Sequence, residues 1–112
     1  LKNIVQKTFG IVDVIKNALS PLLPKVEKAF IYGSIAKGSE RAQSDIDIMI
    51  VSNELSYGEV LDALSSIEGQ LGRVINPTMY SIEEFSQRIT NNQSFIKRVM
   101  EHPKLWIKGN VE

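Results

Sequence analysis

Residues 33–47 combine a glycine–serine turn with two closely spaced aspartates, a pattern suited to binding a polyphosphate and a metal ion. Gly33-Ser34 follows a short apolar run, and Asp45 and Asp47 come next, separated by a single residue. Glycine has no Cβ, so backbone N–H groups can approach phosphate oxygens closely, and a helix beginning there adds a favourable partial charge. The turn therefore predicts a phosphate-binding segment. An ordinary turn is the alternative reading of a Gly-Ser pair on its own.

The two aspartates have strand spacing. Residues two apart on a strand project from the same face, about 6.5–7 Å apart along the backbone, so the carboxylates of Asp45 and Asp47 can converge on one ion. Mg²⁺ takes hard oxygen ligands, and in-line nucleotidyl transfer commonly uses two metal ions about 3.5–4 Å apart. A solvated strand start is the alternative, but residues 46–51 look buried on both faces, where an unpaired carboxylate is costly. We therefore predict that Asp45 and Asp47 bind Mg²⁺ together.

The composition indicates one globular domain. The chain has 112 residues, 43% of them hydrophobic, which is enough for an ordinary core. Its 13 basic and 13 acidic residues cancel, so nothing global attracts nucleic acid. The absence of cysteine excludes thiolate chemistry and fits a cytoplasmic location. No apolar run approaches the roughly 20 residues of a membrane span. Because the chain starts at Leu1, we expect residues 1–112 to be a single domain cut from a longer protein.

Helices and strands are expected to alternate along the chain and to position these residues. The apolar periodicity predicts helices over 9–20, 57–71, 82–89 and 95–101, and strands over 29–32, 45–51, 73–80 and 105–107. Thr8 is a candidate N-cap, and two Ser-x-x-Glu capping boxes begin at Ser56 and Ser81. Gly72 should end the second helix, and Pro77 should place its strand at an edge or a bulge. The fold class expected is α/β (α+β).

Residues 32–39 and 44–50 together resemble the signature of the DNA polymerase β-like nucleotidyltransferase superfamily, and its small bacterial and archaeal members most closely. The resemblance implies a small mixed sheet with helices packed on it. It also implies transfer of a nucleoside monophosphate to a hydroxyl acceptor, with ATP as the expected triphosphate. Gly33, Ser34, Lys37 and Ser39 would hold that nucleotide. Asp45 and Asp47 would bind Mg²⁺ beside it and would be the catalytic residues.

One part of the resemblance is incomplete. Catalytically complete members carry a third carboxylate on the strand after the long helix, and here Asn76 occupies that place, with no Asp or Glu between Gly72 and Ile82. An amide oxygen can ligate Mg²⁺ weakly but cannot accept the hydroxyl proton. We therefore expect Asn76 as a weak metal ligand, an incomplete two-metal site, and weak or absent transfer with nucleotide binding retained. Nearby, Glu84 should cap its helix and Glu68 should be solvated.

Two other functions fit the same residues. Residues 76–85 look like a subgroup in which this domain follows an N-terminal winged-helix DNA-binding domain, which implies a catalytically silent, nucleotide-sensing module of a transcription regulator. The resemblance also extends to antitoxin-like members that act on a HEPN-type toxin as their protein substrate or partner. Within these 112 residues, nothing in the sequence indicates direct nucleic-acid binding.

Overall fold

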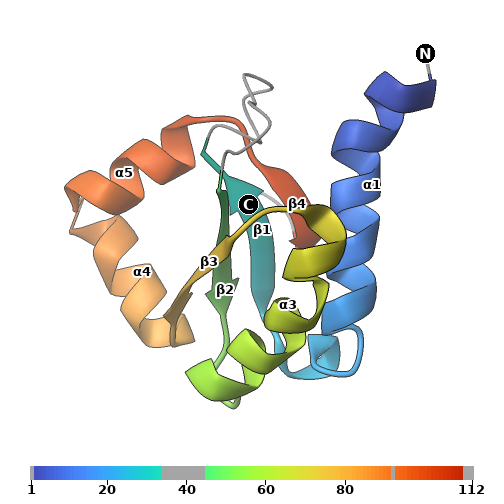
Figure 1. The fold of residues 1–112 in the computed structure, drawn as a ribbon. Coiled ribbons are helices and arrows are strands. Elements are labelled where there is room, and N and C mark those ends of the chain that lie inside the picture. The colour runs from blue at the N-terminus through green and yellow to red at the C-terminus, as the bar shows by residue number, and fades with distance from the viewer. Residues whose placement is uncertain (1, 34–44, 92, 110–112) are drawn as a thin grey trace.

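The computed structural model describes residues 2–33, 45–91 and 93–109, with side chains from residue 10 onward. The elements, shown in Figure 1, are α1 (Lys2–Leu19), the 3-10 turn η1 (Leu23–Lys25), β1 (Lys28–Tyr32), β2 (Ile46–Val51), α3 (Tyr57–Leu71), β3 (Ile75–Tyr80), α4 (Ile82–Thr90), α5 (Ser94–Glu101) and β4 (Leu105–Lys108).

The four strands form one mixed sheet in the order β3-β2-β1-β4. β1 runs antiparallel to both β2 and β4, whereas β2 and β3 are parallel. The two parallel strands are joined through α3, the crossover connection that a parallel pair requires. The predicted α/β (α+β) class with a small mixed sheet is confirmed.

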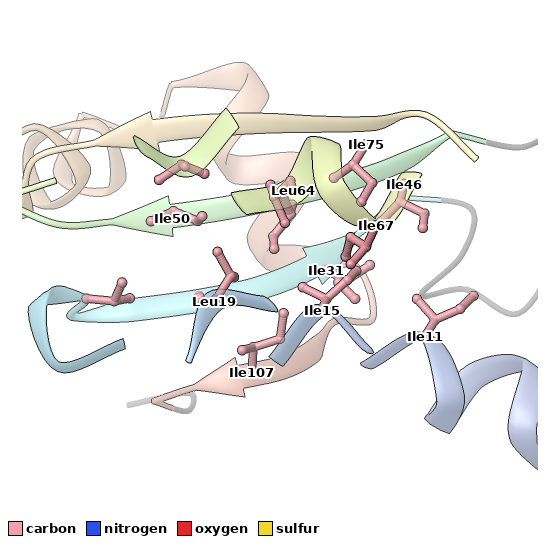
Figure 2. Packing of buried hydrophobic residues seen from close by; sticks show 14 of the residues in the cluster. Ile11, Ile15, Leu19, Ile31, Ile46, Ile50, Leu64, Ile67, Ile75 and Ile107 are labelled. Carbon is pink, nitrogen blue, oxygen red and sulfur yellow. The ribbon is translucent and has the colours of Figure 1, made fainter. Parts of the chain in front are cut away.

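Helices α1 and α3 cover one face of the sheet (Figure 1). The alternation of side chains along β2 explains this, because Ile46, Ile48 and Ile50 all project to that face and are fully buried. Figure 2 shows side chains of both helices pointing at the strands, including Ile15 of α1 and Leu64 of α3. This apolar layer packs α1 and α3 onto β1 and β2.

Helices α4 and α5 pack on the opposite face, on the left in Figure 1. The core there is largely aromatic, with the rings of Phe30 and Trp106 4.9 Å apart and tilted. On β2 this face presents Asp47, Met49 and Val51, of which only Asp47 is not buried. The polar end of β2 therefore lies on the same face as the aromatic core.

Helix boundaries follow the capping chemistry. In both predicted boxes the serine Oγ accepts the N–H of the glutamate three residues later, and that glutamate accepts the serine N–H. Gly72 ends α3 in the left-handed conformation at φ +69°. The prediction that Thr8 caps the first helix is wrong, because α1 begins at Lys2 and no Pro or Gly in residues 2–7 interrupts it.

Strand β3 is an edge strand, as Pro77 predicts. Ile46 N–H donates to the Val74 carbonyl (2.9 Å), and Ser52 N–H donates to the Tyr80 carbonyl (3.0 Å). Because alternate residues face the neighbouring strand, the backbone of Pro77 faces outward, where its missing N–H costs no ladder hydrogen bond.

None of the helices in the described ranges is both long and apolar enough to cross a bilayer.

Candidate functional site

The candidate residues meet at one end of the sheet, where β1 ends and where β2 and β3 begin. In the strand register, Tyr32 of β1 lies opposite Asp47 of β2, and Asp47 lies beside Asn76 of β3. Asp45 immediately precedes β2 and is exposed. Three neighbouring strands thus present a polar row at the rim of the aromatic face.

Gly33 makes room for the carboxylate of Asp47. Its φ is +86°, a conformation that L side chains rarely adopt. A Cβ added to Gly33 would lie 2.7 Å from Asp47 Oδ2, well inside van der Waals contact. The glycine is therefore required twice, by its own backbone angle and by the aspartate packed against it.

Asn76 bridges toward the acidic pair. Its Nδ2 donates a hydrogen bond to Asp45 Oδ2 at 3.1 Å. Burial raises the pKa of Asp47 above its ordinary value, hydrogen bonding from the Asn76 side chain partly opposes this, and the charge of Asp45 adds to it. The Asn76 carboxamide therefore bonds Asp45 and lies beside Asp47, and the two carboxylates repel each other, which a bound cation would relieve.

Tyr32 lies opposite Asp47 and packs against the aromatic core. Its hydroxyl shares a hydrogen bond of 3.3 Å with Thr78 Oγ1. Because Tyr32 and Thr78 belong to strands on either side of β2, about 9–10 Å apart at ordinary strand spacing, the tyrosine side chain must extend across β2. Burial raises the pKa of Tyr32, and the charge of Asp47 raises it further. The Tyr32 hydroxyl therefore stays protonated at neutral pH, and the side chain borders the site.

Glu68 holds the start of β3, which sequence reasoning missed. It is half-buried rather than solvated as predicted, and its Oε2 accepts the Ile75 N–H at 2.7 Å. Ile75 directly precedes Asn76, so this bond positions the asparagine. The sequence carried no signal for it beyond an acidic residue in the last turn of the long helix. Glu84 is used as a cap, as predicted.

The structure therefore brings together Gly33, Asp45, Asp47 and Asn76, which are four of the predicted site residues. Ser34, Lys37 and Ser39, the other three, lie outside the described residues. Across the ranges 2–33, 45–91 and 93–109, no set of three or more His, Cys, Asp or Glu side chains is grouped to hold a metal ion.

These residues fit a hard divalent cation with few protein ligands. Two carboxylates and an amide oxygen are the donor types that Mg²⁺ accepts, and this ion ordinarily uses one or two carboxylates plus phosphate oxygens and water. Asp45 and Asp47 meet that minimum. Asn76 could add its amide oxygen as a ligand only after a rotation of the amide group by about 180°, because the amide nitrogen now faces Asp45.

A search of solved structures finds the same fold. A chain in the crystal structure of a double mutant of the toxin–antitoxin MntA-HpeT superposes with a TM-score of 0.61 at 14% identity, covering 88% of this chain and 73% of that one. A chain in a toxin–antitoxin structure with AMP-PNP gives a TM-score of 0.57 at 18% identity, with the same coverage. At these identities the likeness concerns the fold.

Sequence comparisons reach further. A curated relative, "Putative protein adenylyltransferase MJ0604" of Methanocaldococcus jannaschii, is 33% identical over 81 residues, which cover 72% of this chain and 78% of the relative. The family model described as "Polymerase beta, Nucleotidyltransferase" matches residues 13–105. That range includes strands β1, β2 and β3 and every candidate site residue, and this chain belongs to the polymerase β nucleotidyltransferase family.

Proposed function

We propose that this chain binds Mg²⁺ together with a nucleoside triphosphate at the end of the sheet marked by Asp45 and Asp47. The observation that carries the proposal is the packing of the Asp47 carboxylate against the Gly33 backbone. This contact supports the proposal because it puts acidic oxygen ligands beside the glycine that begins the proposed phosphate-binding turn. Gly33, Ser34, Lys37 and Ser39 are the proposed nucleotide-binding residues, and ATP is the proposed triphosphate.

The proposed reaction is transfer of a nucleoside monophosphate to a hydroxyl. The acceptor oxygen bonds to the α-phosphorus, the bond from that phosphorus to the oxygen bridging to the β-phosphorus breaks, and pyrophosphate leaves. When bound, Mg²⁺ would supply charge stabilisation of the phosphoryl oxygens. The hydroxyl proton passes to a carboxylate of the pair or to water, since Asn76 cannot accept it.

The acceptor we propose is a hydroxyl on a protein. Support comes from the relative at 33% identity, whose name is that of a protein adenylyltransferase. A toxin as the acceptor is a narrower version of this proposal; the two structural neighbours come from toxin–antitoxin complexes, but they share too little sequence to carry that partner over.

A catalytically silent nucleotide sensor is the second candidate. The observation favouring it is Asn76 beside Asp47 in the strand register, where a carboxylate would complete the metal site. Such a chain would bind the Mg²⁺–nucleotide complex and transfer nothing.

Labelled ATP separates the two candidates. The chain is incubated with Mg²⁺, ATP labelled at the α-phosphate and a protein extract, and pyrophosphate release and protein labelling are followed. The transferase is supported if pyrophosphate is released and protein is labelled, and if Asp45→Ala abolishes both. Metal-dependent binding of ATP without either product supports the sensor. Absence of metal-dependent nucleotide binding rejects both.

A further inference from the structure

The side-chain amide of Asn76 points its NH₂ group, and not its oxygen, toward Asp45. Its Nδ2, the end that bears hydrogens, lies 3.1 Å from Asp45 Oδ2. The reverse orientation would place the amide oxygen against a carboxylate oxygen, two acceptors with no hydrogen between them. The acidic pair therefore dictates which end of the carboxamide it faces.

The same side chain also reaches Asp47. It lies beside Asp47 in the parallel register of β2 and β3, and its side chain lowers the pKa of that carboxylate against the effect of burial. The backbone just before Asn76 is held in place, because the Ile75 N–H donates to Glu68 Oε2. The NH₂ group thus stands where two carboxylates of like charge can share its partial positive charge.

A cation bound between the two carboxylates would compete with this N–H group. An amide hydrogen points at Asp45 Oδ2, one of the oxygens that would ligate the ion, and an N–H dipole facing a dication is repulsive. Mg²⁺ also needs its oxygen ligands at about 2.0–2.1 Å, so it requires direct access to the oxygens the amide occupies.

On the basis of the proposed function, we infer that Asn76 acts in the metal-free chain as a hydrogen-bond donor that takes the place of a metal ion between Asp45 and Asp47, and that a metal must displace its amide to bind. Asn76 is then a positioning residue for the acidic pair and a competitor of the ion. This role is the reverse of the weak ligand that the sequence alone predicts.

The two roles make opposite predictions for Asn76→Ala, which leaves the net charge unchanged. If the amide competes, its removal tightens Mg²⁺ binding by about threefold to tenfold, the equivalent of one charge-assisted hydrogen bond weakened by solvent. If the amide oxygen is a ligand, the same substitution weakens binding. Asn17→Ala, an exposed asparagine on α1 across the sheet, is the matched control and should leave the affinity unchanged.

Nuclear magnetic resonance tests the donor role without metal. The side-chain NH₂ signals of Asn76 are identified by their absence from Asn76→Ala. In the metal-free chain, Asp45→Ala should move these signals and Asp62→Ala, on α3, should not. Saturation of the wild-type chain with Mg²⁺ should move them toward their position in Asp45→Ala.

The outcomes separate this inference from the function on which it rests. Unmoved signals in Asp45→Ala, or weaker Mg²⁺ binding by Asn76→Ala, overturn the role of Asn76 and leave the proposed metal site intact. Mg²⁺ binding by Asn76→Ala but not by the wild type supports the competition. Absence of Mg²⁺ binding in both overturns the competition and the proposed metal site together.

Discussion

The Asp47 carboxylate lies against the backbone of Gly33, so close that a Cβ on the glycine would be 2.7 Å from Asp47 Oδ2. The contact joins the end of β1 to the start of β2 and ties the geometry of the turn to that of the acidic pair. Any residue other than glycine at position 33 must therefore disturb the carboxylate as well as the backbone.

Gly33→Ala is expected to lose metal binding and to destabilise the fold. The positive φ alone costs an L residue about 1–2 kcal/mol, and displacement of the carboxylate adds to this. Gly72→Ala is the matched control, because Gly72 also has a positive φ (+69°) but nothing lies within 4 Å of its added Cβ. Chemical denaturation and Mg²⁺ titration of both variants check this. Equal Mg²⁺ affinity in the two would show that the contact with Asp47 does not matter.

Asp47→Asn should stabilise the metal-free chain at neutral pH. Burial raises the pKa of Asp47, so the folded chain holds its proton more tightly than the unfolded chain does, and the ionised carboxylate is a penalty on folding. That penalty is present above the raised pKa and disappears as the pH falls toward the ordinary value of 3.8. Urea denaturation in EDTA from pH 7 to pH 4 should show the advantage of the variant shrinking. An advantage that is constant or grows on acidification contradicts this account.

Asn76→Asp should raise the affinity for Mg²⁺. The substitution replaces a donor with a third carboxylate beside Asp45 and Asp47, adding a full charge close to the ion. We expect an increase of at least tenfold by calorimetry, with a metal-free chain less stable than the wild type because three like charges meet. If the affinity stays the same, Asn76 does not occupy the position of the third ligand.

Glu68→Ala should loosen the start of β3. The Ile75 N–H loses its acceptor, which costs about 1–2 kcal/mol of unfolding free energy for a bond to a charged group. Hydrogen exchange at the Ile75 amide should speed up more than exchange elsewhere in the sheet. Gln70→Ala, an exposed position two residues along α3, should change neither quantity. Similar protection of Ile75 in both variants would count against the role of Glu68.

The sequence predicts the elements well because each has a local cause. The capping boxes at Ser56 and Ser81, the left-handed Gly72 and the outward-facing Pro77 all act within a few residues of their own position. Thr8 misled because a capping residue type inside a continuous helix gives the same local pattern as one at a helix start.

The contacts within the site depend on strand order, which no local pattern encodes. Asn76 contacts Asp45 only because β3 lies next to β2 and parallel to it. Tyr32 reaches Thr78 only because β1 and β3 lie on opposite sides of β2. Spacing within one strand was enough to pair Asp45 with Asp47. It could not show which end of the Asn76 amide faces them.

Calorimetric titration with AMP-PNP, an ATP analogue that resists hydrolysis, tests the central claim most directly. The account predicts that the wild-type chain binds the analogue with Mg²⁺ and not with EDTA, and that Asp45→Asn and Asp47→Asn each weaken binding by tenfold or more. Failure to bind in Mg²⁺, or equal binding in EDTA, would contradict it.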